Sequence, residues 1–142
     1  MNLLEAEDSK VVSIKGFEFT IGVINRQTFR KLSAALDKSK SALLGRAGEI
    51  KAEDIERIRI EEPDRFYDVM EQMTQAYKGF VRYGVTGHKG LLNKKGEEIS
   101  FTKEGDIVSE KTLELYELNS LTIELGNAVI AFNTLSDEER KN

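Results

Sequence analysis

The stretch PDRFYDVMEQMTQAYKGF, residues 63–80, has the clearest helical pattern in the chain. Its large apolar residues recur every three or four positions, which places them on one face of an α-helix. A proline at the start fits, because the N–H that proline lacks would have no partner in the first helical turn. The pattern predicts an amphipathic helix over about 64–80. The residues that we expect in the core are Phe66, Met70, Met73 and Tyr77.

The residues before this helix predict a β-hairpin followed by another helix. Apolar and polar residues alternate on both sides of Lys15, as in two strands joined by a tight turn, and the hairpin is predicted over 9–24. Asn25 then stands where an N-cap belongs, since its side chain can accept an exposed backbone N–H at a helix start. Helical spacing follows over about 26–44. The pattern in 49–60 fits either a short helix or a strand, and both stay open.

The segment YGVTGHKGLLNKKGEEISF, residues 83–101, follows the central helix and contains the only histidine, His88. Asn93 and Gly96 have the chemistry of a tight turn, because asparagine favours the opening position and glycine tolerates a positive φ. Apolar residues on both sides of this turn can pair as strands. A second β-hairpin is therefore predicted over 83–103, between two helical parts.

The carboxyl-terminal part predicts two more helices. Ser109 is the expected N-cap of a short helix over about 110–117, and a more apolar helix follows over about 120–134. Ser136 and Glu139 are spaced as a capping box, in which each side chain accepts the other residue's backbone N–H. We therefore expect a last charged turn to begin at Ser136.

The order of these elements predicts an α+β fold, mostly helical, with an N-terminal β-hairpin and a second hairpin between helices. At 142 residues, the chain is expected to form a single domain, 1–142. It contains no cysteine, so disulfides and thiolate chemistry are excluded. The first residues are acidic, and no apolar run approaches the roughly 18 residues that cross a membrane. The expected location is therefore the cytoplasm, with no membrane partner.

Charge is distributed unevenly along the chain. A net charge of −4 argues against a nucleic-acid partner, because proteins that bind DNA or RNA are normally basic. Residues 80–103 have a net positive charge instead, with five basic residues against two acidic ones. This basic stretch is either a solvated loop whose lysines keep the protein soluble or a docking tip for an acidic partner. The candidate partner-binding residues are Lys89, Lys94 and Lys95.

The same segment does not match the patterns of phosphate binding or catalysis. A P-loop needs glycine-lysine-serine or glycine-lysine-threonine between a strand and a helix, which GVTGHKG lacks. A catalytic or metal-binding histidine needs partners, and the sequence neighbours of His88 provide none. We therefore expect His88 to be an exposed loop residue whose replacement by alanine changes little. No catalytic residue, metal site or cofactor is predicted, and the protein is not expected to be an enzyme.

From Arg82 onward, short motifs follow one another in a distinctive order. Arg-x-Gly-Val-x-Gly comes first, then a turn that ends in glycine, then Phe-x-x-Glu, a helix with ELGNAVI and the terminal LSDEERKN. This order, over about the last 60 residues, resembles small proteins of the tail-gene clusters of tailed bacteriophages and prophages, grouped with tail assembly chaperones. The chain departs from the family pattern at His88, where tryptophan is common. The matching residues are Arg82, Gly84, Val85, Gly87, Gly96, Phe101, Glu124, Leu125, Leu135, Ser136, Glu138, Glu139, Lys141 and Asn142.

The resemblance implies a protein without enzymatic activity that acts during phage tail assembly. Such a chaperone binds the tape measure protein, the tail tube subunit, or both, and keeps them soluble in the host cell cytoplasm while the tail polymerises. The resemblance also implies a longer minor product, made by a translational frameshift near Lys141 or Asn142. Two alternatives stay open: a structural virion component, such as a head–tail joining or tail protein, and a phage inhibitor of a host defence protein. The sequence also allows a homo-oligomer.

Overall fold

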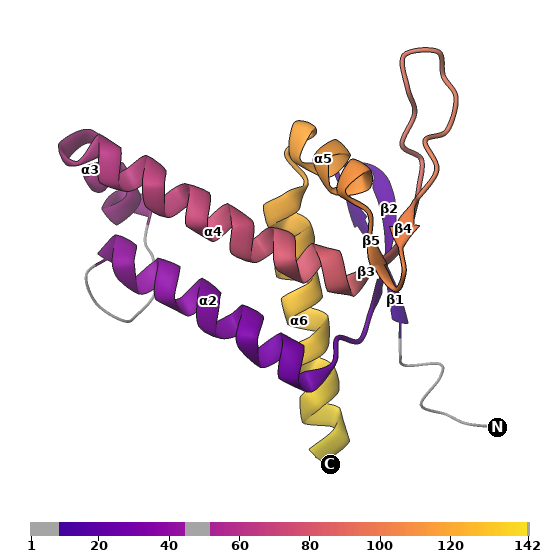
Figure 1. Cartoon of the computed structure of the whole chain (residues 1–142), viewed down its shortest axis with the longest axis horizontal. Coiled ribbons are helices and arrows are strands. Elements are labelled where there is room, and N and C mark those ends of the chain that lie inside the picture. Colours follow the sequence, from indigo (N-terminus) through magenta and orange to yellow (C-terminus); the bar gives the residue numbers. More distant parts are fainter. Residues whose placement is uncertain (1–8, 45–51, 142) are drawn as a thin grey trace.

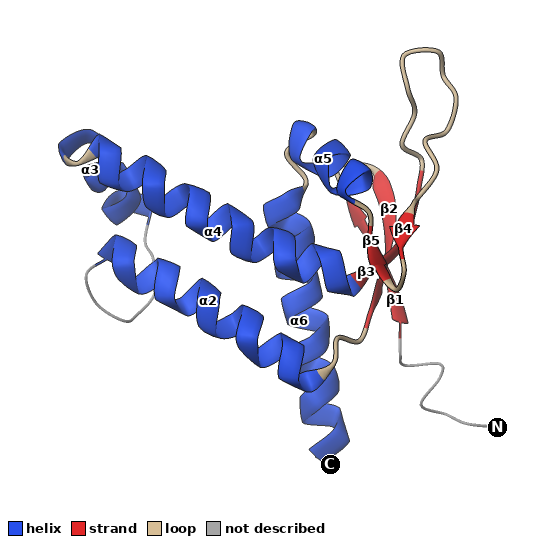
Figure 2. Cartoon of the chain, in the orientation of Figure 1, coloured by secondary structure: helices blue, strands red, loops and turns tan. Residues whose placement is uncertain are grey.

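The computed structural model describes the backbone of residues 9–44 and 52–141 (Figure 1). It has the predicted α+β fold, with helices in the majority (Figure 2). The strands form a three-stranded antiparallel sheet of order β1-β2-β3 and a smaller pair, β4-β5. The elements in chain order are β1 (Ser9–Ile14), β2 (Phe17–Gly22), α2 (Arg26–Leu44), α3 (Ala52–Glu61), α4 (Pro63–Gly84), β3 (Val85–Lys89), β4 (Lys103–Glu104), β5 (Ile107–Val108), α5 (Glu110–Leu118) and α6 (Thr122–Lys141).

The N-terminal hairpin and the helix after it confirm the sequence-based prediction. Lys15 and Gly16 join β1 to β2 with φ of 53° and 85°, and a turn with two positive φ angles matches the twist of the strands. The Asn25 side chain accepts hydrogen bonds from the backbone N–H of Gln27 at 2.9 Å and of Thr28 at 3.3 Å. Asn25 is therefore the N-cap of α2, which covers the predicted range.

The segment that fitted either a helix or a strand is a helix, α3, over its described part; residues 49–51 lie outside the described residues. Pairs of opposite charge three and four positions apart favour the helix, with Arg57 lying 3.8 Å from Asp54 and 3.7 Å from Glu61. The next helix, α4, has its proline in the first turn as expected. It continues past the predicted end at 80 to Gly84, because its last turn packs against α6.

The predicted second hairpin over 83–103 is wrong in its first half. Residues 85–89 form β3, which pairs with β2 rather than with the chain that follows, and thereby completes the three-stranded sheet. Only the middle of the segment folds back on itself, with the Asn93 N–H donating to the Glu97 carbonyl at 2.8 Å and a single bridge between Leu92 and Glu98. The turn glycine, Gly96, has the expected positive φ of 78°. The small β4-β5 pair was not predicted.

The carboxyl-terminal helices agree with the prediction in part. Ser109 is the N-cap of α5, because its hydroxyl accepts the backbone N–H of Thr112 at 3.2 Å. The expected helix start at Ser136 is wrong, since α6 runs without a break from Thr122 to Lys141. A capping box stabilises N–H groups that lack a helical partner, and inside a continuous helix these groups bond to the preceding turn instead.

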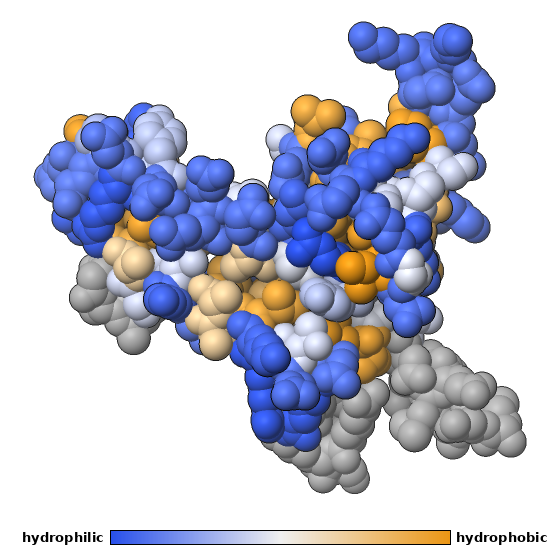
Figure 3. Space-filling model, viewed as in Figure 1, coloured by the Kyte–Doolittle hydropathy of each residue, from blue (hydrophilic) through white to orange (hydrophobic). Residues whose placement is uncertain are grey.

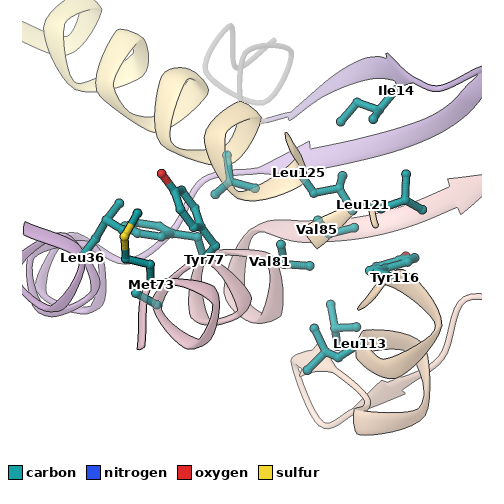
Figure 4. Packing of buried hydrophobic residues seen from close by; sticks show 14 of the residues in the cluster. Ile14, Leu36, Met73, Tyr77, Val81, Val85, Leu113, Tyr116, Leu121 and Leu125 are labelled. Atoms are coloured by element: carbon teal, nitrogen blue, oxygen red, sulfur yellow. The ribbon is translucent and has the colours of Figure 1, made fainter. Parts of the chain in front are cut away.

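The core extends along α4, which packs against α2 and α6, and continues between the sheet and α5. In Figure 4, Met73 of α4 lies beside Leu36 of α2. Phe66, Met73 and Tyr77 are buried as predicted, whereas Met70 is half-buried against the same cluster. α2 and α4 run antiparallel, with α3 at one end of the pair and the sheet at the other (Figure 1).

Two glycines allow α4 and α6 to cross closely. A Cβ atom at Gly126 of α6 would lie 2.7 Å from Tyr77 Cδ1, and one at Gly84 of α4 would overlap the side chain of Val129. Real Cβ atoms do not come this close to other atoms. The two helices can therefore lie at their present separation only because both positions are glycine.

A buried amide ties α6 to the end of the sheet. Asn133 Oδ1 accepts the backbone N–H of Ile24 at 2.7 Å. Its Nδ2 donates to the carbonyls of Gly22 at 3.3 Å and of Val129 at 2.9 Å. The side chain therefore satisfies the backbone N–H of Ile24, just beyond β2, and also bonds to the carbonyl of Gly22, the last residue of β2.

Candidate partner-binding site

A long loop, residues 90–102, stands away from the rest of the molecule (Figure 1). Its end is a defined turn, because Asn93 Oδ1 accepts the N–H groups of Lys95 at 2.9 Å and of Glu97 at 3.0 Å. Lys94 and Lys95 lie at this end and are exposed. We call these two residues the lysine tip; Figure 3 shows how hydrophilic the loop end is.

The third predicted partner-binding residue, Lys89, is not at the tip. It is the last residue of β3, where it lies opposite Glu18 of β2 in the sheet register. The structure therefore brings Lys94 and Lys95 together and leaves Lys89 at the base of the loop. Binding of a partner by these three lysines stays a prediction.

His88 is not the exposed loop residue that the sequence led us to expect. It lies on β3, half-buried, with Nε2 at 2.7 Å from the Ile99 carbonyl oxygen and Nδ1 at 2.6 Å from the Tyr116 hydroxyl. A carbonyl can only accept, so Nε2 carries the hydrogen and Nδ1 of the neutral ring accepts from the tyrosine. The ring also meets those of Phe19 and Phe101 edge-on, with centroids 6.5 and 5.5 Å away.

His88 therefore fastens the base of the loop to α5. Burial raises the pKa of Tyr116 still further above neutrality, and its protonated hydroxyl can donate to His88. The sequence could not show this contact, because the pairing of β2 with β3 shifts register between Thr20 and Ile21. Such a shift changes which strand residues face the core, so His88 and Val85 both face inward although simple alternation puts them on opposite faces.

An open groove separates the loop from α5, and we call it the loop–α5 groove. It has a volume of about 530 Å³. Its most exposed apolar residue is Leu118, with 84% of its surface accessible. The residues that line it are Asn93, Ile99, Ser100, Thr102, Lys111, Thr112, Glu114, Leu115 and Leu118.

A second hollow, the α4–α5 cleft, lies between α4, the end of α5 and the start of α6, with a volume of about 420 Å³. Its lining includes two carboxylates, Glu71 and Glu117, and no lysine or arginine. Glu117 Oε1 is 3.3 Å from Lys78 Nζ, an ion pair without hydrogen-bond geometry. The Thr122 hydroxyl is buried and forms no hydrogen bond with a described residue. The residues that line the cleft are Glu71, Thr74, Gln75, Glu117, Ser120, Thr122 and Ile123.

The described residues contain no group of three or more His, Asp or Glu side chains that could hold a metal ion. Within the same part of the chain, every helix is too short or too polar to span a membrane. Comparison with family models, with curated proteins and with solved structures finds no match.

Proposed function

We propose that the protein is a non-enzymatic tail assembly chaperone of a bacteriophage or prophage. It binds the tape measure protein, or the tail tube subunit, in the cytoplasm of the host cell while the tail is assembled. The observation that carries the proposal is the loop–α5 groove. The segment whose motifs resemble tail assembly proteins, from Arg82 onward, supplies every residue that lines it.

The groove has the composition of a surface for a protein segment. Leu115, Leu118 and Ile99 give it apolar contact area, while Lys111 and Glu114 lie among its polar lining. Apolar area that leaves water on binding contributes about 25 cal/mol per Å². A mixed lining of this kind is typical of complexes that form and separate again, which a chaperone requires.

The role of His88 supports binding rather than catalysis. Both ring nitrogens are engaged, one with the Tyr116 hydroxyl and one with the Ile99 carbonyl. The only histidine of the chain therefore holds one wall of the groove in place. General acid–base catalysis by His88 would require one of these two hydrogen bonds to break.

Coexpression tests the proposal. The tape measure protein encoded in the same tail-gene cluster is produced alone, with the wild-type chain, or with Leu118→Asp. We expect the wild-type chain to raise the soluble fraction of the tape measure protein and to copurify with it, and Leu118→Asp to abolish both. The matched control is Val11→Asp, which places the same charge at an exposed apolar residue of β1.

Mass spectrometry of purified particles separates a chaperone from a virion component. A chaperone leaves before the tail is complete and is absent from mature particles. Finding the chain there in stoichiometric amounts, with no effect on the solubility of the tape measure protein, would overturn the proposal in favour of a structural part of the tail.

A further inference from the structure

The lysine tip is a cationic group without an ion-pair partner among the described residues. Lys94 and Lys95 are adjacent in the turn at the end of the loop. This loop stands away from the body (Figures 1 and 3). The Asn93 side chain fixes the turn that carries them, as described above. A fixed turn loses less conformational freedom on binding than a flexible one. The tip is therefore organised in advance for contact with an acidic site.

The α4–α5 cleft has the opposite chemistry. Glu71 has no ion-pair partner among the described residues, and only Lys78 lies beside Glu117. Glu117 Oε1 and Thr122 Oγ1 are buried and receive no hydrogen bond there. Thr122 is only 5% exposed, so water reaches it poorly. Each of these two oxygens can accept a hydrogen bond, and a lysine ammonium supplies three donors and no acceptor.

We propose that two copies of the chain bind each other, with the lysine tip of one copy seated in the α4–α5 cleft of the other. In Figure 1 the loop extends away from α4 and α5, so the cleft that the tip meets belongs to a second copy. The ammonium groups pair with Glu71 and Glu117, and the loop end fills the cleft. This association needs no tail protein and goes beyond the proposed chaperone function.

Charge complementarity selects this occupant. In the acidic carboxyl-terminal half of the chain, residues 80–103 carry an excess of basic residues, and the tip is the exposed end of this stretch. The lining of the cleft includes carboxylates but no lysine or arginine. Lys78 offsets part of the charge of Glu117, which leaves Glu71 as the main partner of the tip. Contacts of this kind between different surfaces of two copies can close into a ring or continue as a filament.

Sedimentation of the purified full-length chain tests the interface. We expect concentration-dependent association at low salt and its loss in about 1 M salt, where the Debye length falls to about 3 Å. Lys94→Glu combined with Lys95→Glu should weaken association by about tenfold or more, because two attractions become repulsions. Glu71→Lys should do the same from the other side of the interface.

The decisive variant combines all three substitutions, which exchanges the charges of the tip and of Glu71. Association should return toward the wild-type level, since a direct contact recovers when both signs are exchanged. Matched controls on the exposed surface of α2 are Lys31→Glu with Lys38→Glu, and Asp37→Lys; these should associate as the wild type does. Circular dichroism establishes that each variant is folded.

Three results would overturn the interface. The first is a wild-type chain that stays monomeric at low salt at every concentration. The second is loss of association on tip reversal with no effect of Glu71→Lys, which would place the tip on another acidic surface. The third is failure of the combined variant to recover although it is folded. The assay contains no tail protein, so each of these results leaves the chaperone proposal standing.

Discussion

In the arm, formed by α3 and the first half of α4, charged side chains pair with neighbours three or four residues away. Arg57 pairs with Asp54 and Glu61 in this way, and Arg65 with Glu62 at 2.9 Å. In the body, formed by the sheet, α5 and α6, polar side chains join segments far apart in the chain, as Asn133 does with Ile24 and His88 with Tyr116. Local pairs on an exposed helix contribute little each, whereas buried links between distant segments stabilise a single arrangement. The arm should therefore tolerate substitution better than the body.

The largest effect is expected at Phe19 in the body. Its side chain is fully buried and meets the rings of His88 and Tyr116 edge-on. Phe19→Ala should lower the free energy of unfolding by about 3–5 kcal/mol, measured by chemical denaturation. Phe66→Ala is the matched change in the arm and should cost less, because Phe66 keeps some contact with solvent. An equal loss of unfolding free energy at both sites would mean that the arm does not tolerate substitution better than the body.

A smaller effect is expected where His88 fastens the loop. His88→Ala leaves the buried Tyr116 hydroxyl and the Ile99 carbonyl without partners, which should cost about 1–3 kcal/mol. Thermal unfolding measures the loss, and hydrogen exchange should show faster opening of the 90–102 loop. Lys38→Ala, at an exposed position on α2, is the control. An unchanged melting temperature would support the exposed loop histidine that the sequence indicated.

A long-range polar link of the arm, between α4 and the end of α2, should have an intermediate effect. Arg65 of α4 donates to the carbonyl of Leu43 at 3.0 Å, and also to that of Ala42, at the end of α2. A cation at a helix C-terminus contributes about 0.3–1 kcal/mol. Arg65→Met keeps much of the apolar stem and should lose about this amount in a denaturation experiment. A loss as large as that of His88→Ala would contradict the division between arm and body.

The smallest effect is expected for the local ion pairs of α3. Arg57 is exposed and pairs with Asp54 and Glu61 at 3.8 and 3.7 Å. Arg57→Ala should cost about 0.5 kcal/mol or less, and nothing in high salt, where exposed pairs are screened. Denaturation curves at two salt concentrations test this. A loss that persists in high salt would show that Arg57 contributes by packing rather than by charge.

The same division explains how much of the fold could be predicted from the sequence. Signals that act within a few residues identified the hairpin turn at Lys15, the N-caps Asn25 and Ser109, and the apolar stripe of α4. Each depends on chemistry at fixed spacings of up to four residues, which a single sequence contains. The elements built from such signals are present in the structure near their predicted positions.

Predictions failed where the partner of a segment lies far away in the chain. The strand at 85–89 looked like half of a local hairpin, but β2 offers a longer pairing partner and an apolar face for His88. Ser136 has the spacing of a helix start, yet the α-helix before it continues. Of the candidate site, the sequence indicated the lysine tip but neither hollow, because each hollow is made by elements that meet only in the folded chain.

The position of Asn133 bears on the order in which the molecule folds during synthesis. Its links to Ile24 and Gly22 span 109 and 111 positions, so the first hairpin leaves the ribosome long before the residue that completes it. Arm helices with local contacts can form early, whereas the body has to wait for α6. Until then the apolar face of β2, with Phe19 and Ile21, has no cover from α6. A nascent chain that stalls before α6 is therefore the species most exposed to aggregation and to capture by the chaperones of the cell.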